Sequence, residues 1–294
     1  MIKKIVIAFI IYSVALLFIG RNLYFLPEIR FGSNKTQAED IRKNVLEKFL
    51  KGEKGSYSIY YKDLATGQEF GINENKVLTA GSLNKLLIVS YLYNLARDNK
   101  INLEDKITIQ KKDIQDYGTG SLRYEGKGKP YALKTLTQLA LEQSDNTAAY
   151  VLSIKLGEDK IQEYGNKLGL SSTSMANNKT TARDMGKILE LIFLKKITTE
   201  SLTAELLDFM KDTDFEDRLV RDIPSSVAVY HKASDATNMV HDAGIVDPTS
   251  LGELRGASDG DPFILAVLTS DIKDEEEAKK TIGKIAKFVY DRGN

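Results

Sequence analysis

The chain has no cysteine and only two histidines, His231 and His241, among its 294 residues. The absence of thiols excludes a disulfide framework and any thiolate metal site. The two histidines fall in strand-like stretches without the spacing of metal ligands, so we interpret both as structural. We therefore predict no metal site, no cofactor and no zinc hydrolase.

An excess of charge of either sign is also missing, because 41 basic residues balance 41 acidic ones. A domain that binds nucleic acid usually carries an excess of basic residues, so this balance gives no indication of nucleic-acid binding. Hydrophobic residues make up 42% of the chain, and we find neither internal repeats nor low-complexity tracts. The composition predicts one or two packed domains without disorder, and it leaves the oligomeric state open.

Long apolar runs are absent except near the N-terminus, where Ile5 to Ile19 follow two lysines. The run fits the core of a signal peptide and is short for a membrane span unless Leu23 to Leu26 extend it. Because small cleavage-site residues do not follow it, we expect residues 1–26 to be an uncleaved membrane anchor and residues 27–35 a linker. The rest of the chain would then lie outside the cytoplasm. Cleavage with secretion is the alternative, and a buried helix of a soluble domain is less favoured.

Strand patterns occur at both ends of the remaining chain, and helical patterns lie between them. We therefore predict an α/β fold of the α+β kind, with an antiparallel sheet built from both chain ends and flanked by helices. An all-helical lobe at about residues 82–222 would be inserted in this domain, which covers residues 36–294. The expected strands are at residues 57–61, 69–72, 227–233, 240–246 and 263–269, and the flanking helices are at residues 36–50 and from 274 onward.

Ser82 and Lys85 are three residues apart at the point where a helical pattern begins after Gly81. If Gly81 forms the turn, the hydroxyl and the amine lie on one face of the helix. Serine is a poor nucleophile that needs a neighbouring base, and a desolvated lysine is able to act as one. The free N–H groups at the helix start also favour negative charge on an attacked carbonyl oxygen.

An S-x-x-K pattern alone carries little information, because it is expected about once by chance in a chain of this length. A second copy is indeed formed by Ser270 and Lys273. Two further motifs distinguish the first copy: an S-D-N motif begins at Ser144 after an amphipathic stretch, and Lys232 ends a strand pattern. In this order the three motifs resemble the class A β-lactamases and penicillin-binding proteins.

The resemblance extends from about Lys54 to the end of the chain. Gln143–Ala149 is similar to the S-D-N helix start of the family, and Thr180–Met185 to the helix entry that follows its omega loop. His241–Val246 is similar to the strand after its K-T-G strand. The resemblance implies the same sheet and helical lobe that the patterns predict.

The resemblance also implies a catalytic set of Ser82, Lys85 and Ser144. Ser82 would attack an acyl carbonyl and form an acyl-enzyme, while Lys85 accepts its proton directly or through water. Ser144 would relay a proton to the leaving nitrogen. The implied substrate is a small β-lactam or peptidoglycan-type amide.

The implied substrate-binding residues are Asn146, Lys232, Ser234 and Asp235. Asn146 would hold a substrate amide, and Lys232 would attract a substrate carboxylate and keep the amine of the catalytic lysine partly neutral. The backbone N–H groups of Asp235 and of the nucleophile would form the oxyanion hole.

The stretch Lys232-Ala233-Ser234 departs from the K-T-G of the family. Ala233 lacks the hydroxyl that would bind a substrate carboxylate, and Ser234 replaces a glycine, with its own hydroxyl as a partial substitute. Asp235 adds a negative charge near the predicted oxyanion site. We therefore expect a penicillin-like carboxylate to be bound less well.

The omega-loop glutamate that activates the deacylating water in class A enzymes has no counterpart between Ser171 and Lys179. Glu163 falls in an expected helix, and we assign it no catalytic role. General-base help is worth a factor of about 10² to 10⁴, so we predict a serine hydrolase or acyltransferase that deacylates slowly. A working β-lactamase and a catalytically silent cell-wall binding module are the alternatives.

Two other patterns are weaker. Gly256–Gly260 matches a G-x-S-x-G nucleophile elbow, but no histidine follows it and a strand is expected next, so we predict a hairpin loop. Tyr117 precedes a glycine-containing loop that leads toward the S-D-N motif. We predict it either as an aromatic wall of the site or as a surface residue.

Overall fold

A computed structural model describes residues 34–249 and 260–293. Contacts within the chain divide it after Ala38, and the larger unit begins at Glu39. The predicted anchor at residues 1–26 and nearly all of the predicted linker lie outside the described residues, as does most of the predicted hairpin loop around Ser258. Among the helices of the described ranges, none has the length and hydropathy of a membrane span.

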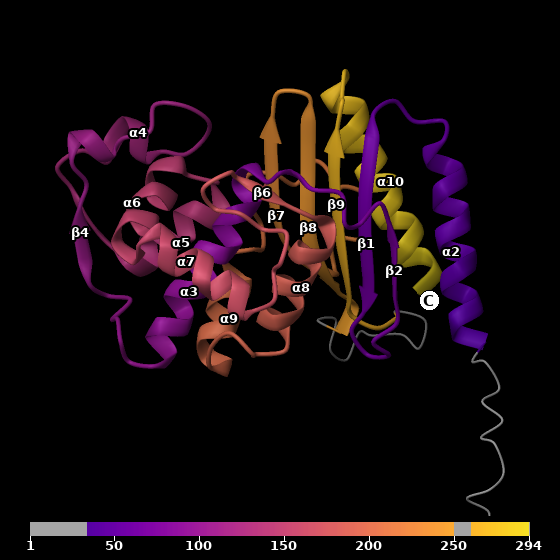
Figure 1. Ribbon diagram of the computed structural model, residues 1–294, viewed down its shortest axis with the longest axis horizontal. Coiled ribbons are helices and arrows are strands. Elements are labelled where there is room, and N and C mark those ends of the chain that lie inside the picture. Colours follow the sequence, from indigo (N-terminus) through magenta and orange to yellow (C-terminus); the bar gives the residue numbers. More distant parts are fainter. Residues whose placement is uncertain (1–33, 250–259, 294) are drawn as a thin grey trace, which may run out of the picture. The chain divides into compact units, whose positions relative to one another are not determined.

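The centre of the fold is a five-stranded antiparallel sheet in which strands from both chain ends are neighbours (Figure 1). Valine, isoleucine and tyrosine are frequent in these segments and favour extended backbone. The order across the sheet is β2, β1, β9, β8 and β7, which confirms the predicted sheet and leaves β7 at one edge. The strands are β1 (Ser56–Asp63), β2 (Glu69–Ile72), β7 (Ala228–Ala236), β8 (Met239–Asp247) and β9 (Phe263–Ser270).

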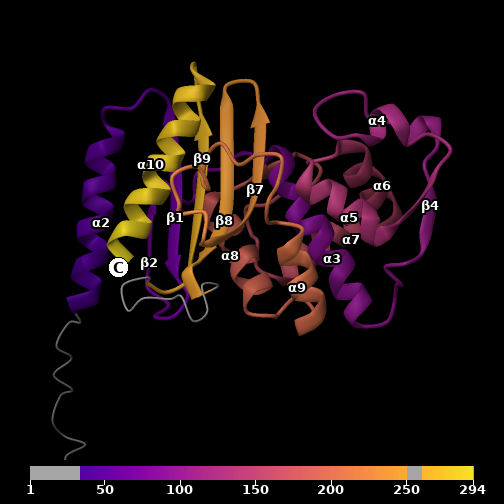
Figure 2. The same cartoon turned by 180° about the vertical axis from the view of Figure 1, so that it is seen from behind.

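One face of the sheet is covered by α10 (Glu275–Gly293) and by the part of α2 (Asn34–Leu50) that follows Ala38 (Figures 1 and 2). Apolar side chains recur on α10 at helical spacing, and they pack against alternate residues of the strands. The fully buried members of this stripe include Ile282, Ile285 and Val289.

The opposite face carries α8 (Ala182–Phe193), which contacts β1, β8 and β9. The main helices of the inserted lobe pack around α3 (Lys85–Arg97) and share one apolar core with α8 and the sheet (Figure 1). The predicted lobe is thus confirmed in its main helices, but it is not all-helical, because short strands also lie within residues 82–222. Its remaining main helices are α5 (Leu133–Glu142), α6 (Asn146–Leu156), α7 (Glu158–Lys167) and α9 (Glu200–Asp208).

Several short elements were not predicted, because two to four residues are too few to show a period. They comprise the paired strands β3 (Leu78–Thr79) and β6 (Lys179–Thr180), the paired strands β4 (Lys106–Thr108) and β5 (Pro130–Ala132), and the short helices η3 (Lys111–Asp113) and α4 (Leu122–Glu125). The predicted helix from Ser82 begins as the short 3₁₀ helix η2 (Gly81–Asn84). The β3–β6 pair matters for the site, because it fixes the segment before Ser82 against the segment before α8.

His231 lies on β7 and is fully buried between two carboxylates. Its Nδ1 is 2.9 Å from Asp242 Oδ1, and its Nε2 is 3.1 Å from Glu216 Oε1. Burial alone would lower the pKa of His231, but the two carboxylates outweigh it and raise the pKa to about 9. The same carboxylates accept the backbone N–H groups of Leu219 and Thr213, so the imidazolium ties the loop before β7 to the sheet. His231 is structural, as predicted.

This cluster predicts that the protein loses stability at alkaline pH. Because the pKa of folded His231 lies above the ordinary value of 6.5, its contribution is complete below pH 6.5 and is lost as the pH rises through about 9. The contribution is on the order of 3 kcal/mol. The free energy of unfolding is measured with urea below pH 6.5 and above about pH 9. Between these two conditions it should fall less in His231→Gln than in the unchanged protein.

His241→Gln is the matched control, because His241 is also buried on a neighbouring strand but has a pKa lowered by burial. It should retain the alkaline loss. An equal alkaline loss in the unchanged protein and in His231→Gln would contradict the assignment.

Candidate active site

Ser82 lies at the start of η2, directly before α3, at the turn that the sequence predicted. Gly81 adopts a φ of 55°, in the left-handed region where glycine is favoured. The turn begins as a 3₁₀ helix and continues as α3, with Leu83 fully buried beneath it. Ser82 itself is partly exposed, and Lys85 opens α3 one turn later.

Lys85 is buried, with 6% of its surface exposed, and its amine points at the S-D-N motif. The Nζ atom donates to the backbone oxygen of Ser144, to Ser144 Oγ at 3.2 Å and to Asn146 Oδ1 at 2.8 Å. The structure therefore brings Lys85, Ser144 and Asn146 together, as the resemblance implied.

The S-D-N motif owes its shape to its middle residue. Ser144 has a φ of 54°, and Asp145 follows as the N-cap of α6, where its carboxylate accepts the N–H of Ala148 at 2.8 Å. The second oxygen of Asp145 accepts the N–H of Leu122, also at 2.8 Å. The left-handed turn and the cap together direct the serine and asparagine groups toward the lysine.

The environment of Lys85 favours its uncharged form. Burial lowers the pKa of Lys85 well below its ordinary value of 10.5, the charge of Lys232 lowers it further, and Asp145 opposes both. An amine with a lowered pKa is a better proton acceptor, which is the role predicted for Lys85, and the serine hydroxyl that it contacts in the structure is that of Ser144.

Lys232 lies on the edge strand β7 and is also buried. Its Nζ donates to the backbone oxygen of Ala233 at 3.1 Å and lies 5.3 Å from the centre of the Phe215 ring. Burial lowers the pKa of Lys232 to about 7 against the attraction of nearby carboxylates, with Arg218 contributing to the decrease. The charge of Lys232 also contributes to the lowered pKa of Lys85, but burial is the main cause of the lowered pKa of each lysine.

Ser234 takes a position that the sequence did not reveal. Its Oγ accepts the backbone N–H of Ser82 at 2.8 Å. This N–H is one of the two predicted donors of the oxyanion hole, so the side chain that replaces a glycine in the motif occupies that donor. The contact is so close that a Cβ added at Gly81 would lie 2.2 Å from the same oxygen.

Asp235 is held by Arg218, a residue that no sequence pattern indicated. The guanidinium donates to both carboxylate oxygens, with Nη2 at 3.0 Å from Oδ2. Arg218 precedes β7 by a loop with no regular pattern, so no periodicity linked it to the strand. The predicted negative charge at residue 235 therefore forms part of a salt bridge beside the site.

The segment in place of an omega loop is short and firmly tied. Asp184, in the first turn of α8, accepts the N–H of Ser172 at 2.9 Å and the hydroxyl of Thr173 at 2.8 Å. At the other end, the backbone oxygen of Asn178 accepts the N–H of Ala80 at 2.8 Å. The segment carries no acidic residue, as the sequence indicated.

A cavity of about 190 Å³ opens beside Lys85 and Asn146. Tyr117 is among its lining residues, and the backbone oxygen of Tyr117 accepts Asn146 Nδ2 at 3.1 Å. Because 63% of Tyr117 is exposed, it is a surface residue at the rim of the cavity. The cavity continues along α6 to Glu158, which no sequence motif singled out. Because α6 alone rises by about 15 Å over its length, the backbone of Glu158 lies about one helix length from Asn146. Glu163 is on the exposed face of α7.

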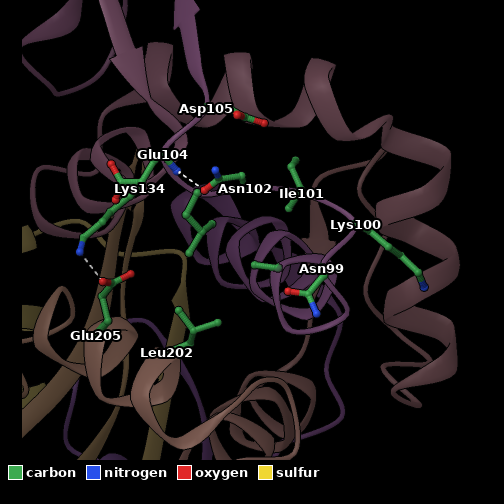
Figure 3. Close-up of a pocket in the computed structure, with 11 residues that line it drawn as sticks. Asn99, Lys100, Ile101, Asn102, Glu104, Asp105, Lys134, Leu202 and Glu205 are labelled. Carbon is green, nitrogen blue, oxygen red and sulfur yellow. Dashed lines mark hydrogen bonds and ion pairs between the residues drawn. The ribbon is translucent and has the colours of Figure 1, made fainter.

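A larger cavity of about 580 Å³ lies at the opposite end of α3 (Figure 3). Its lining includes Asn99 to Asp105 and the ion pair of Lys134 with Glu205. None of the predicted site residues lines it, so we place the active site at the N-terminal end of α3.

Comparisons with known proteins identify the family of the chain. The model of a family described as the beta-lactamase enzyme family matches residues 38–292. A β-lactamase of Bacillus amyloliquefaciens is 24% identical over 288 residues, which cover 89% of this chain and 90% of the relative.

Solved structures of low sequence identity share the fold. A β-lactamase from Chitinophaga pinensis superposes with a TM-score of 0.78 at 21% identity, covering 86% of this chain and 99% of that one. A variant of PBP-A, solved as its acyl-enzyme complex with penicillin G, has a TM-score of 0.75 at 20% identity and covers 86% of this chain and 95% of that one. Since the family model spans most of its length, the chain belongs to the beta-lactamase enzyme family and is a serine hydrolase of that family.

Proposed function

We propose that this hydrolase forms an acyl-enzyme at Ser82 with β-lactam or peptidoglycan-type amides and releases the acyl group slowly. The observation that carries the proposal is the buried amine of Lys85, which contacts Ser144 and Asn146 and has a lowered pKa. The PBP-A variant, which has the same fold, forms an acyl-enzyme complex with penicillin G, and this supports the substrate class.

Acylation uses the residues in a fixed order. Ser82 Oγ attacks the carbonyl carbon as its proton passes to Lys85 Nζ, directly or through a water molecule. The tetrahedral intermediate then collapses, the carbon–nitrogen bond breaks, and the leaving nitrogen takes a proton through Ser144 Oγ. This relay fits the 3.2 Å separation between Lys85 Nζ and Ser144 Oγ. The result is an ester on Ser82 and a restored lysine amine.

Deacylation lacks an evident base among the residues that the structure describes. The segment 171–179 has no carboxylate, and Glu158 is a helix length away along the cavity. Since a positioned base accelerates such a step by a factor of about 10² to 10⁴, the ester is expected to persist. Transfer to an amine or to water would then set the turnover rate.

The location of the reaction is a further part of the proposal. The two lysines and the apolar run within residues 1–26 support a membrane anchor with the hydrolase domain outside the cytoplasm. Secretion after cleavage would give the domain the same access to cell-wall substrates.

A second candidate is a catalytically silent cell-wall binding module. It is favoured by the contact between Ser234 Oγ and the N–H of Ser82, which removes a donor from the oxyanion hole, and by the altered Lys232-Ala233-Ser234 stretch. This candidate requires that ligands bind without forming a covalent bond.

Incubation with a fluorescent penicillin should add the full mass of the ligand to the protein, and the adduct should persist well beyond the acylation time. Ser82→Ala should abolish it, and Lys85→Ala should slow it at least about a hundredfold, because general-base help is lost. The acylation rate should fall at acidic pH as Lys85 becomes protonated. Intact-mass spectrometry over time measures all three effects.

Ser270→Ala and Lys273→Ala are the matched controls, because they alter the second S-x-x-K pattern at the exposed end of β9. Both should acylate normally. Reversible binding without any adduct, unchanged in Ser82→Ala, would support the silent module instead.

Ser234→Gly should accelerate acylation by about 10 to 100 fold, because it frees the N–H of Ser82 for the developing oxyanion. Ser234→Ala should give a similar acceleration, since it also removes the accepting hydroxyl. The rate constant for adduct formation with penicillin measures the effect. Slower acylation in both variants would show that the hydroxyl instead substitutes for the one missing at Ala233.

A further inference from the structure

We propose that Asp235 determines specificity by occupying the cationic receptor that a substrate carboxylate would use. The site would then take acyl donors that carry no anionic group beside the scissile bond. This inference rests on the proposed acylation at Ser82 and defines the substrate class of the same site.

The first observation is the salt bridge itself. Arg218 is buried, with 1% of its side chain exposed, whereas 36% of the Asp235 side chain is exposed. The guanidinium donates to both oxygens of Asp235 and, through Nε, to Asp217 at 2.8 Å. A molecule that approaches this edge of the sheet therefore meets the carboxylate before the guanidinium.

The second observation is the position of the pair at the site. β7 is an edge strand, and its side chains alternate, with Lys232 and Ser234 on one face and Ala233 and Asp235 on the other. A ligand that lies along this edge would contact both sets.

Phe215 connects the two cations. Arg218 Cζ is 5.8 Å from the centre of the Phe215 ring, and Lys232 Nζ is 5.3 Å from it. The two positive groups thus lie against one side chain, and Asp235 interacts electrostatically with both. Asp235 is accordingly placed between the solvent and this cationic group.

The balance of charge follows from these contacts. Asp235 compensates Arg218, and burial keeps Lys232 partly uncharged near neutral pH. A substrate carboxylate would meet a fixed negative charge and little uncompensated positive charge, and like charges at short distance repel. An amide or ester whose leaving group is uncharged avoids this repulsion.

Penicillin G and its methyl ester provide the test, because they share the acyl group and the leaving nitrogen and differ in the charge of the carboxylate. The rate of adduct formation at Ser82 is measured by intact mass for each compound and divided by that compound's rate of hydroxide hydrolysis. The unchanged protein should acylate with the ester at least about tenfold faster than with the acid. Asp235→Asn should reduce this ratio at least about tenfold, and Asp235→Glu should largely keep it.

Asp271→Asn is the matched control, since Asp271 is an exposed aspartate directly after β9 that accepts the hydroxyl of Ser270. It should leave the ratio unchanged. If Asp235→Asn does not fold, the unchanged protein still tests the inference. Its preference for the ester over the acid should decrease at high ionic strength, because salt screens the charges. A ratio of one or less, or a ratio that a folded Asp235→Asn leaves unchanged, overturns the inference.

The outcome also separates this inference from the proposed function. Adducts that form with both compounds at equal normalised rates contradict the role of Asp235 alone. The absence of an adduct with either compound contradicts acylation at Ser82, and the specificity inference fails with it.

Discussion

The site depends on the removal of the Lys85 amine from water. A lysine in water holds its proton too firmly to act as a base near neutral pH, and burial removes the hydration that stabilises the charged form. The protein compensates the buried amine with three oxygens from the S-D-N motif, so the amine is held in one place without a carboxylate partner. These acceptors fix the position of the amine and stabilise its charged form, whereas burial and the charge of Lys232 lower its pKa.

The edge strand β7 contributes to the site from both of its faces. Ser234 reaches toward Ser82 on one side, and Asp235 reaches Arg218 on the other. Behind the second face, the charged His231 holds the loop that carries Phe215 and Arg218. A buried ionic cluster on one side of the strand therefore supports the wall of the site, while the reacting groups lie on the other side.

The main elements of the fold were predictable, because apolar spacing over eight or more residues distinguishes helices from strands. The helical lobe and the antiparallel sheet both follow from it. The motifs also located Lys85, Ser144 and Asn146, since each belongs to a short sequence motif whose residue types serve a specific reaction. Arg218 and Phe215 were not predictable, because they lie in an irregular loop. Its position is set by ion pairs with residues on β7 and by a backbone hydrogen bond to Asp242 on β8. The contact of Ser234 with the N–H of Ser82 joins positions 152 residues apart, so only the folded structure reveals it.

The close approach of Ser234 to Gly81 has an evolutionary consequence. Two independent constraints keep residue 81 a glycine: its left-handed backbone, and the hydroxyl that fills the space of a side chain. Only the second constraint would vanish if residue 234 became a glycine. The glycine at position 81 would thus still be required by its backbone after a change at position 234.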